Sequence, residues 1–145
     1  MKNKWIIFGA SVFSIALIVE VVFSFYRFQS KPLCYEESCN NLDATYQRCH
    51  LDAKTLIEEE LQGRKIELRH SARCNASWTR AIVPPGSTIY VKDSQGNIYA
   101  DNYTVPNDKV PAAHYGNMGP GKKLRACVGL PNDTHLCTKL ANEEK

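Results

Sequence analysis

Six cysteines are the residues of this sequence best suited to covalent chemistry: Cys34, Cys39, Cys49, Cys74, Cys127 and Cys137. All of them follow a long apolar segment at the N-terminus, and an even number of cysteines behind such a segment is typical of disulfides in an exported chain. Spacing alone leaves the pairing open. If all six are paired, at least one of the three cysteines before residue 50 must bridge to the later body of the chain.

A zinc site is the alternative use of the first three cysteines. Cys34, Cys39, Cys49 and His50 carry thiol and imidazole ligands, but their spacing matches no common zinc finger. A redox-active pair would need the spacing C-x-x-C, which the sequence lacks. We therefore expect structural disulfides, with no metal and no cofactor.

A basic cluster lies in the middle of the chain, and its members are Arg64, Lys65, Arg69, Arg73 and Arg80. Such a cluster favours an anionic partner, for example a cell-wall polymer or lipid headgroups. The structural alternative is that Arg69 and Arg80 pair with Asp52 or Glu67 and lock the fold. Basic and acidic residues nearly balance beyond residue 30, which argues against nucleic acid as a partner. We take Arg69, Arg73 and Arg80 as candidate binding residues.

Tyr115 is a fourth candidate binding residue. It lies in a predicted long loop, residues 104–121, which mixes aromatic residues with glycine and proline and either contacts a glycan or peptide or only connects strands. Acid–base chemistry would fall to the histidines, which are His50, His70, His114 and His135. No nucleophile-elbow serine and no H-E-x-x-H helix accompanies them, so we expect no enzyme and name no catalytic residue.

The composition is that of one folded domain. The chain has 145 residues, of which 43% are hydrophobic and 23% charged, and this excludes a disordered charged tail. It is also too short for a nucleotide-binding domain joined to a substrate domain. Within residues 31–145, the segment 31–50 is polar and rich in cysteine, which indicates a loop stapled by disulfides.

Local patterns predict the elements that hold these residues in place. Residues 52–63 read as a helix, because Leu56, Ile57 and Leu61 share one helical face and Gly63 can end it. Alternating patterns then predict antiparallel strands over residues 65–69, 77–83, 87–92, 98–101 and 123–128. We expect Trp78 to pack on a disulfide in the core. The fold class is therefore α+β and mostly β: a small disulfide-stapled antiparallel sheet or barrel-like domain preceded by one short helix.

The N-terminus predicts a membrane segment. Lys2 and Lys4 precede an apolar run at residues 5–28, and residues 5–26 are long enough to span a bilayer as a helix. We expect residues 1–30 to be an uncleaved signal anchor with the N-terminus inside and residues 31–145 outside the cytoplasm. The alternative is a signal peptide that is cleaved near Ser24, which would release a secreted protein.

Several spaced motifs resemble one protein family. Residues 67–80, ELRHSARCNASWTR, are similar to the signature ELRYSpxCxAaWAR of the DUF2690 family, also called YjfA-like proteins. The resemblance extends over about residues 34–128 through C-x4-C before Asp43, the run from Cys49 to Thr55, and R-A-C at residues 125–127. Asn41, Ala44 and His70 depart from the usual Gly, Pro and Tyr of the family pattern. The resemblance implies a small bacterial exported or membrane-anchored protein, and it implies no catalytic residues.

These patterns together favour a non-enzymatic binding or structural module of the bacterial cell envelope. Its partners would be the membrane, through residues 5–26, and either an anionic wall polymer or a protein. The second hypothesis is a secreted inhibitor, toxin-like or immunity factor that acts on a protein partner. A small hydrolase is the third.

Overall fold

The computed structural model describes residues 15–26, 31–107 and 112–141, and it divides the chain into two units, residues 1–31 and 32–145. Residues 15–26 are helical. No helix in the described ranges is both long enough and apolar enough to cross a membrane. The first part of the predicted membrane segment, residues 5–14, lies outside those ranges, so the anchor stays a prediction.

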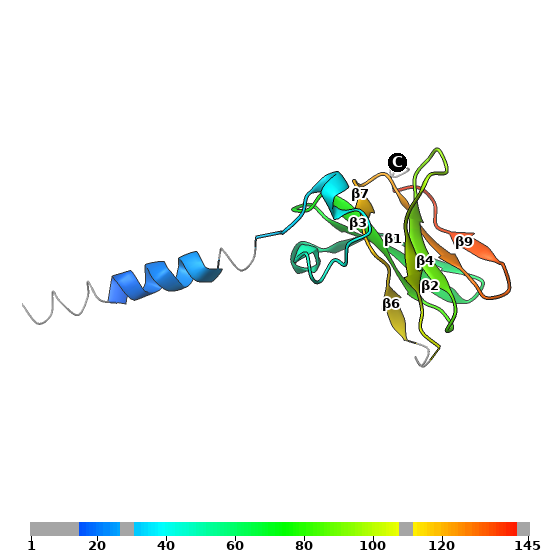
Figure 1. Cartoon of the computed structure of the whole chain (residues 1–145), viewed down its shortest axis with the longest axis horizontal. Helices are drawn as coiled ribbons and strands as arrows, with labels where there is room; N and C mark the ends of the chain where they lie inside the picture. Colours follow the sequence, from blue (N-terminus) through cyan, green and yellow to red (C-terminus); the bar gives the residue numbers. More distant parts are fainter. Residues whose placement is uncertain (1–14, 27–30, 108–111, 142–145) are drawn as a thin grey trace, which may run out of the picture. The chain divides into compact units, whose positions relative to one another are not determined.

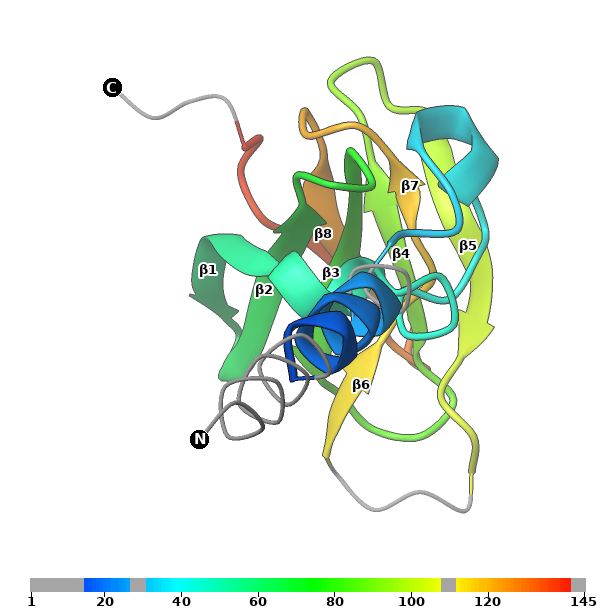
Figure 2. The ribbon, with the colours of Figure 1, turned by 90° about the vertical axis from the view of Figure 1, so that its left-hand side faces the viewer.

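The second unit contains two antiparallel sheets (Figures 1 and 2). The first sheet has the order β1-β2-β3-β6, formed by Lys54–Leu61, Arg64–Ser71, Ala76–Ile82 and Ala113–Tyr115, and β7 (Gly119–Pro120) also pairs with β3. The second sheet has the order β5-β4-β8-β9, formed by Ile98–Thr104, Thr88–Lys92, Arg125–Gly129 and His135–Cys137. The predicted antiparallel architecture is confirmed. The barrel alternative is wrong, because no ladder among the described strands joins the two sheets into a closed ring.

One hydrophobic core fills the space between the sheets. Ile66 and Leu68 of β2 are fully buried, as their alternation predicts, and they belong to the same cluster as Val91 of β4 and Val128 of β8. Burial of each aliphatic side chain of this kind contributes about 1.5–3 kcal/mol. The opposite face of β2 is therefore free to carry polar and charged residues.

The prediction of a helix over residues 52–63 is wrong, because β1 occupies most of this segment. A bulge between Thr55 and Ile57 inserts one extra residue into the strand, so that both Leu56 and Ile57 contact the core. Two adjacent apolar residues followed by Leu61 have the spacing of one face of a helix. The segment is nevertheless a strand, in which side chains alternate with a period of two residues. Gly63 does adopt the left-handed conformation, with φ of +69°, but as part of the hairpin turn between β1 and β2.

The predicted loop over residues 104–121 and the segment after the last predicted strand, which ends at residue 128, both contain short strands that the sequence did not reveal. β6 and β7 pair with β3 inside the former, and β9 pairs with β8 inside the latter. Each of these strands has only two or three residues, which is too short to display an alternating pattern. Their pairing depends on the neighbouring strand rather than on their own composition.

The segment before β1, residues 31–53, is called the cysteine arm below. It contains two short 3-10 helices, η1 (Glu36–Cys39) and η2 (Cys49–Asp52). The six cysteines pair as Cys34–Cys39, Cys49–Cys74 and Cys127–Cys137. Cys49–Cys74 is the predicted bridge from arm to body. Trp78 is 2% exposed and packs in the cluster formed by the arm cysteines, which confirms its predicted place.

Candidate functional site

The outer face of the first sheet gathers most of the predicted binding residues. Cross-strand partners share a face, and the register pairs Glu67 with Arg80 and Arg69 with Trp78 across β2 and β3. β6 continues this face with Tyr115, which lies opposite Arg80. The side chains that point away from the core between the sheets are therefore charged and aromatic, and Trp78 among them packs in a second buried cluster with the arm cysteines.

A cavity of about 400 Å³ lies between this outer face and the cysteine arm. The sheet supplies a cation and two aromatic residues, and the arm supplies polar groups. The lining residues used below are Arg69, Trp78 and Tyr115 from the sheet and Asp43, Thr45 and His50 from the arm. The Cys49–Cys74 disulfide attaches the arm to the turn that follows β2, so a covalent bond links the two walls of the cavity.

Arg69 is the cation in the wall of this cavity. Its Nη1 donates a hydrogen bond to Oγ1 of Thr55 at 2.7 Å, and its Nη2 donates one to the carbonyl oxygen of Ala53 at 3.1 Å. Both acceptors are neutral, and across the described residues no carboxylate lies within ion-pair distance of this guanidinium. The predicted pairing of Arg69 with Asp52 or Glu67 is therefore wrong, and the positive charge of the side chain stays uncompensated by contact.

Asp43 brings a carboxylate to the arm side of the cavity. Its Oδ1 accepts hydrogen bonds from the backbone N–H groups of Thr45, at 2.8 Å, and Tyr46, at 2.9 Å. These two donors offset part of its negative charge and hold the turn that forms the arm wall. The carboxylate thus has a structural role in the cavity.

The remaining cations of the outer face are neutralised beside the cavity. Lys65 contacts Glu58 at 2.9 Å and Glu67 at 3.3 Å, and the hydrogen bond to Glu58, followed by that to Glu67, raises the pKa of Lys65. Arg80 forms an ion pair with the buried Glu67 at 2.5 Å, which confirms the structural alternative for this arginine. Arg80 also donates to the hydroxyl of Tyr115 at 3.1 Å and lies 5.7 Å from the centre of its ring. It therefore positions Tyr115 at the cavity.

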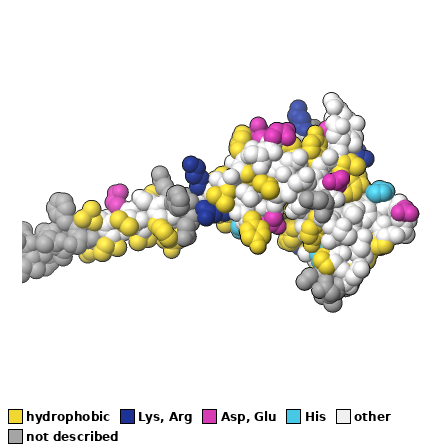
Figure 3. Space-filling model, in the orientation of Figure 1, with side chains coloured by type: hydrophobic (Ala, Val, Ile, Leu, Met, Phe, Trp, Pro, Cys, Tyr) yellow, Lys and Arg dark blue, Asp and Glu magenta, His cyan; other side chains and the backbone are white. Residues whose placement is uncertain are grey.

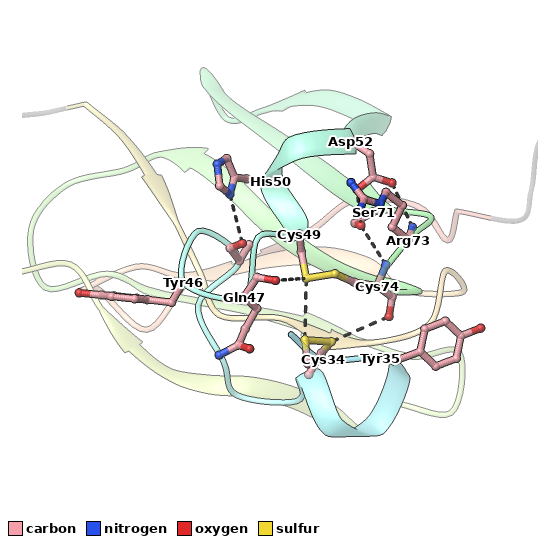
Figure 4. Close-up of a disulfide and its surroundings, with 12 residues drawn as sticks. Cys34, Tyr35, Tyr46, Gln47, Cys49, His50, Asp52, Ser71, Arg73 and Cys74 are labelled. Carbon is pink, nitrogen blue, oxygen red and sulfur yellow. Dashed lines mark hydrogen bonds between the residues drawn. A yellow bond between two sulfur atoms is a disulfide. The ribbon is translucent and has the colours of Figure 1, made fainter. Parts of the chain in front are cut away.

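Arg73 lies outside this lining, on the turn between β2 and β3. Its backbone N–H donates to Asp52 of the arm at 3.0 Å, and the hydroxyl of Ser71 donates to the same carboxylate at 2.6 Å (Figure 4). Burial acts to raise the pKa of Asp52, but these hydrogen bonds outweigh it and lower the pKa below its ordinary value. Asp52 is thus a second contact that attaches the arm to the body of the domain, in addition to the Cys49–Cys74 disulfide.

Asp52→Asn is expected to weaken the domain at neutral pH more than in acid. The lowered pKa means that the carboxylate stabilises the folded state above about pH 4, the ordinary value for aspartate, and that this contribution disappears as the pH falls through the folded pKa. We expect a loss of about 1–2 kcal/mol at pH 7, because solvent screens a partly exposed carboxylate, and little loss near pH 2. Urea unfolding across this range measures the difference, with Glu60→Gln on β1 as the control. An equal loss at both pH values would contradict the assigned role.

The four histidines lie in different surroundings. His50 lines the cavity with Nδ1 3.4 Å from the carbonyl oxygen of Ala44, and His70 contacts Oγ of Ser77 at 3.0 Å. Burial, followed by the charge of Lys122, lowers the pKa of His70. The other two contact tyrosine hydroxyls: His114 that of Tyr103 at 3.4 Å, and His135 that of Tyr90 at 3.0 Å. Only His50 therefore lies where a ligand in the cavity would meet it.

A model of the family described as "Protein of unknown function (DUF2690)" matches residues 37–138. The chain belongs to the DUF2690 family. The resemblance that the sequence motifs predicted is thus confirmed at this level, whereas the further name of YjfA-like proteins stays a prediction. No curated protein and no solved structure matches the chain.

In this DUF2690 chain, two segments of the predicted resemblance meet at the cavity. Residues 67–80 supply Arg69 and Trp78, and the segment that follows Cys39 supplies Asp43. The sequence did not predict that Thr45 and His50 would lie near Arg69. The signal that could have shown it is the required arm-to-body bridge, because pairing Cys49 with Cys74 brings residue 50 close to the end of β2.

Proposed function

We propose that this DUF2690 protein is a non-enzymatic binding module of the bacterial cell envelope, and that its cavity holds an anionic group of a wall polymer. The N-terminal segment would anchor it in the membrane with the domain outside the cytoplasm. The complete pairing of the six cysteines supports an oxidising location of this kind.

The observation that carries the proposal is the guanidinium of Arg69 in the cavity wall with neutral partners only. A phosphate or carboxylate of a ligand would pair directly with this guanidinium, which binds such groups through paired N–H donors. Thr55 and Ala53 hold the side chain in place, so that little conformational entropy is lost on binding.

The ion pairs beside the cavity reduce the number of cations that could attract an anionic ligand. Lys65 and Arg80 already contact Glu58 and Glu67, so they add little to the attraction of a polyanion. The basic cluster of the sequence is therefore not one positive patch, and Arg69 is the member best placed for a ligand. Tyr115, held by Arg80 and half exposed, offers a ring against which a sugar or polymer chain can pack.

Arg69→Gln is expected to reduce retention of the protein on purified bacterial cell walls. Loss of one charge-assisted contact corresponds to about a tenfold or greater loss of affinity. The wild-type protein should also be released as the salt concentration rises, since the contact is electrostatic. The measurement is co-sedimentation with walls between low and physiological salt.

Arg64→Gln is the matched control, because it removes the same charge from the other end of β2, where the guanidinium donates to the carbonyl oxygen of Gln62 outside the cavity. We expect it to bind almost as the wild type does. If the two variants lose retention equally, binding follows net charge and the cavity is not the site.

Exposed apolar residues favour the second candidate function, recognition of a protein partner. Hydrophobic side chains reach the surface at several places on the face shown in Figure 3. On the arm Tyr46 is 82% and Leu51 53% exposed, and on the outer face of the first sheet Ile82 and Tyr115 are also exposed. Such residues are common anchors in protein interfaces. Crosslinking in intact cells separates the candidates: a single protein product that is lost in Tyr46→Ala supports a protein partner, and crosslinks to wall material support the first proposal.

A further inference from the structure

The two disulfides at the cysteine arm form one compact group of sulfur atoms. The Sγ atoms of Cys34, Cys39, Cys49 and Cys74 all lie within 4.8 Å of one another. Between the two disulfides, the sulfur atoms of Cys34 and Cys49 are 3.8 Å apart. Figure 4 shows the two bridges side by side at the base of the arm. The third disulfide, Cys127–Cys137, belongs to the other sheet.

This arrangement has the dimensions of a tetrathiolate metal site. Four sulfur ligands at about 2.3 Å from a tetrahedral Zn²⁺ are separated from one another by about 3.8 Å. The contact between Cys34 and Cys49 already has this spacing. Once the two disulfides are reduced, the bonded sulfur atoms move apart, and all four can occupy the corners of such a tetrahedron with small shifts of the side chains.

The surroundings also suit a tetrathiolate site. Cys39, Cys49 and Cys74 are completely buried and Cys34 nearly so, within a cluster that includes Trp78. Such apolar packing keeps water and competing oxygen ligands away from the sulfur atoms. Four thiolates and one Zn²⁺ carry a net charge of about −2. Arg48 precedes Cys49 and Arg73 precedes Cys74 in the sequence, so two cations stand next to the ligands on the chain.

We propose that the reduced chain binds one Zn²⁺ through the thiolates of Cys34, Cys39, Cys49 and Cys74. A dithiol reductant gives two electrons and two protons to each disulfide and is itself oxidised to a disulfide. Zn²⁺ then displaces the four thiol protons and forms four Zn–S bonds. The metal would hold the arm on β2 and β3 under conditions in which the disulfides are open. The fourth ligand is Cys74, which replaces the His50 of the zinc set considered from the sequence. This site is independent of the anionic ligand proposed for the cavity.

Cobalt tests the site, because tetrahedral thiolate coordination of Co²⁺ gives intense visible bands and a sulfur-to-metal band in the near ultraviolet. The full chain, kept in a mild detergent, is reduced without oxygen and titrated with Co²⁺. We expect saturation at one equivalent, loss of the bands when Zn²⁺ is added, and no bands for the oxidised chain. Native mass spectrometry of the reduced chain should show one bound Zn²⁺.

Two double variants locate the ligands. Cys127→Ser with Cys137→Ser removes the third disulfide and should leave the cobalt spectrum and its stoichiometry unchanged. Cys34→Ser with Cys74→Ser removes one ligand from each bridge of the cluster and should abolish the tetrathiolate bands. The proposal is overturned if the reduced wild-type chain shows no such bands, or if they persist in Cys34→Ser with Cys74→Ser. Because the metal itself orders such a site, the readout does not require a folded apo chain.

Discussion

Replacing Cys49 and Cys74 together by alanine is expected to lower the free energy of unfolding by about 3.5 kcal/mol. The bridge closes a loop of 25 residues, the longest among the three disulfides, so it restricts the unfolded chain the most. It is also the covalent link between the cysteine arm and the body of the domain. Differential scanning calorimetry and urea unfolding of the oxidised proteins measure this loss.

The other two disulfides serve as matched controls. Loop lengths of 10 residues for Cys127–Cys137 and 5 for Cys34–Cys39 predict smaller losses, of about 2.7 and about 2 kcal/mol. The expected order of stability losses is therefore that of the loop lengths. A loss for Cys34–Cys39 that equals or exceeds that for Cys49–Cys74 would mean that the arm is attached mainly by packing.

Trp78→Ala is expected to cost about 3–5 kcal/mol of stability, the typical range for removing a buried aromatic side chain. Trp78 is 2% exposed, packs among the arm cysteines, and lines the cavity from β3. Its removal leaves a hole between the arm and the first sheet, because the Cys49–Cys74 disulfide fixes the arm on the turn after β2 and restricts its movement into the space. Chemical unfolding of the variant, monitored by circular dichroism, gives the loss.

Tyr46→Ala is the control for this substitution, since Tyr46 belongs to the same arm but is 82% exposed. We expect its stability to lie within about 0.5 kcal/mol of the wild type. A loss of less than 1 kcal/mol for Trp78→Ala would show that the arm does not depend on this side chain, and the description of the cavity would have to change.

The strands that border the cavity could be predicted because their patterns are strong and local. In β2, Ile66 and Leu68 alternate with charged residues, and in β3 the run 77–83 ends at two prolines. β1 could not be predicted, because its bulge places Leu56 and Ile57 side by side and mimics a helix. The position of a bulge depends on the register with the partner strand, and the local sequence of a strand does not reveal that register.

The candidate site was predictable only in part for the same kind of reason. Residue type marks Arg69 and Tyr115 as candidates, yet only the pairing of β3 with β6 and the bridge from Cys49 to Cys74 bring them together with His50. The same criterion marks Arg73 and Arg80. Arg73 lies on a turn and Arg80 lies beside the buried Glu67, and these positions distinguish both residues from Arg69. The local sequence pattern does not reveal either position.

We propose above that the cavity binds an anionic polymer group through Arg69. Its most direct test is isothermal titration of purified wall teichoic acid into the wild-type protein and into Arg69→Gln and Arg64→Gln. We predict that Arg69→Gln raises Kd about tenfold or more. Arg64→Gln should change it by less than about threefold, because it removes the same charge outside the cavity. An unchanged Kd for Arg69→Gln, or equal weakening in both variants, would contradict the claim.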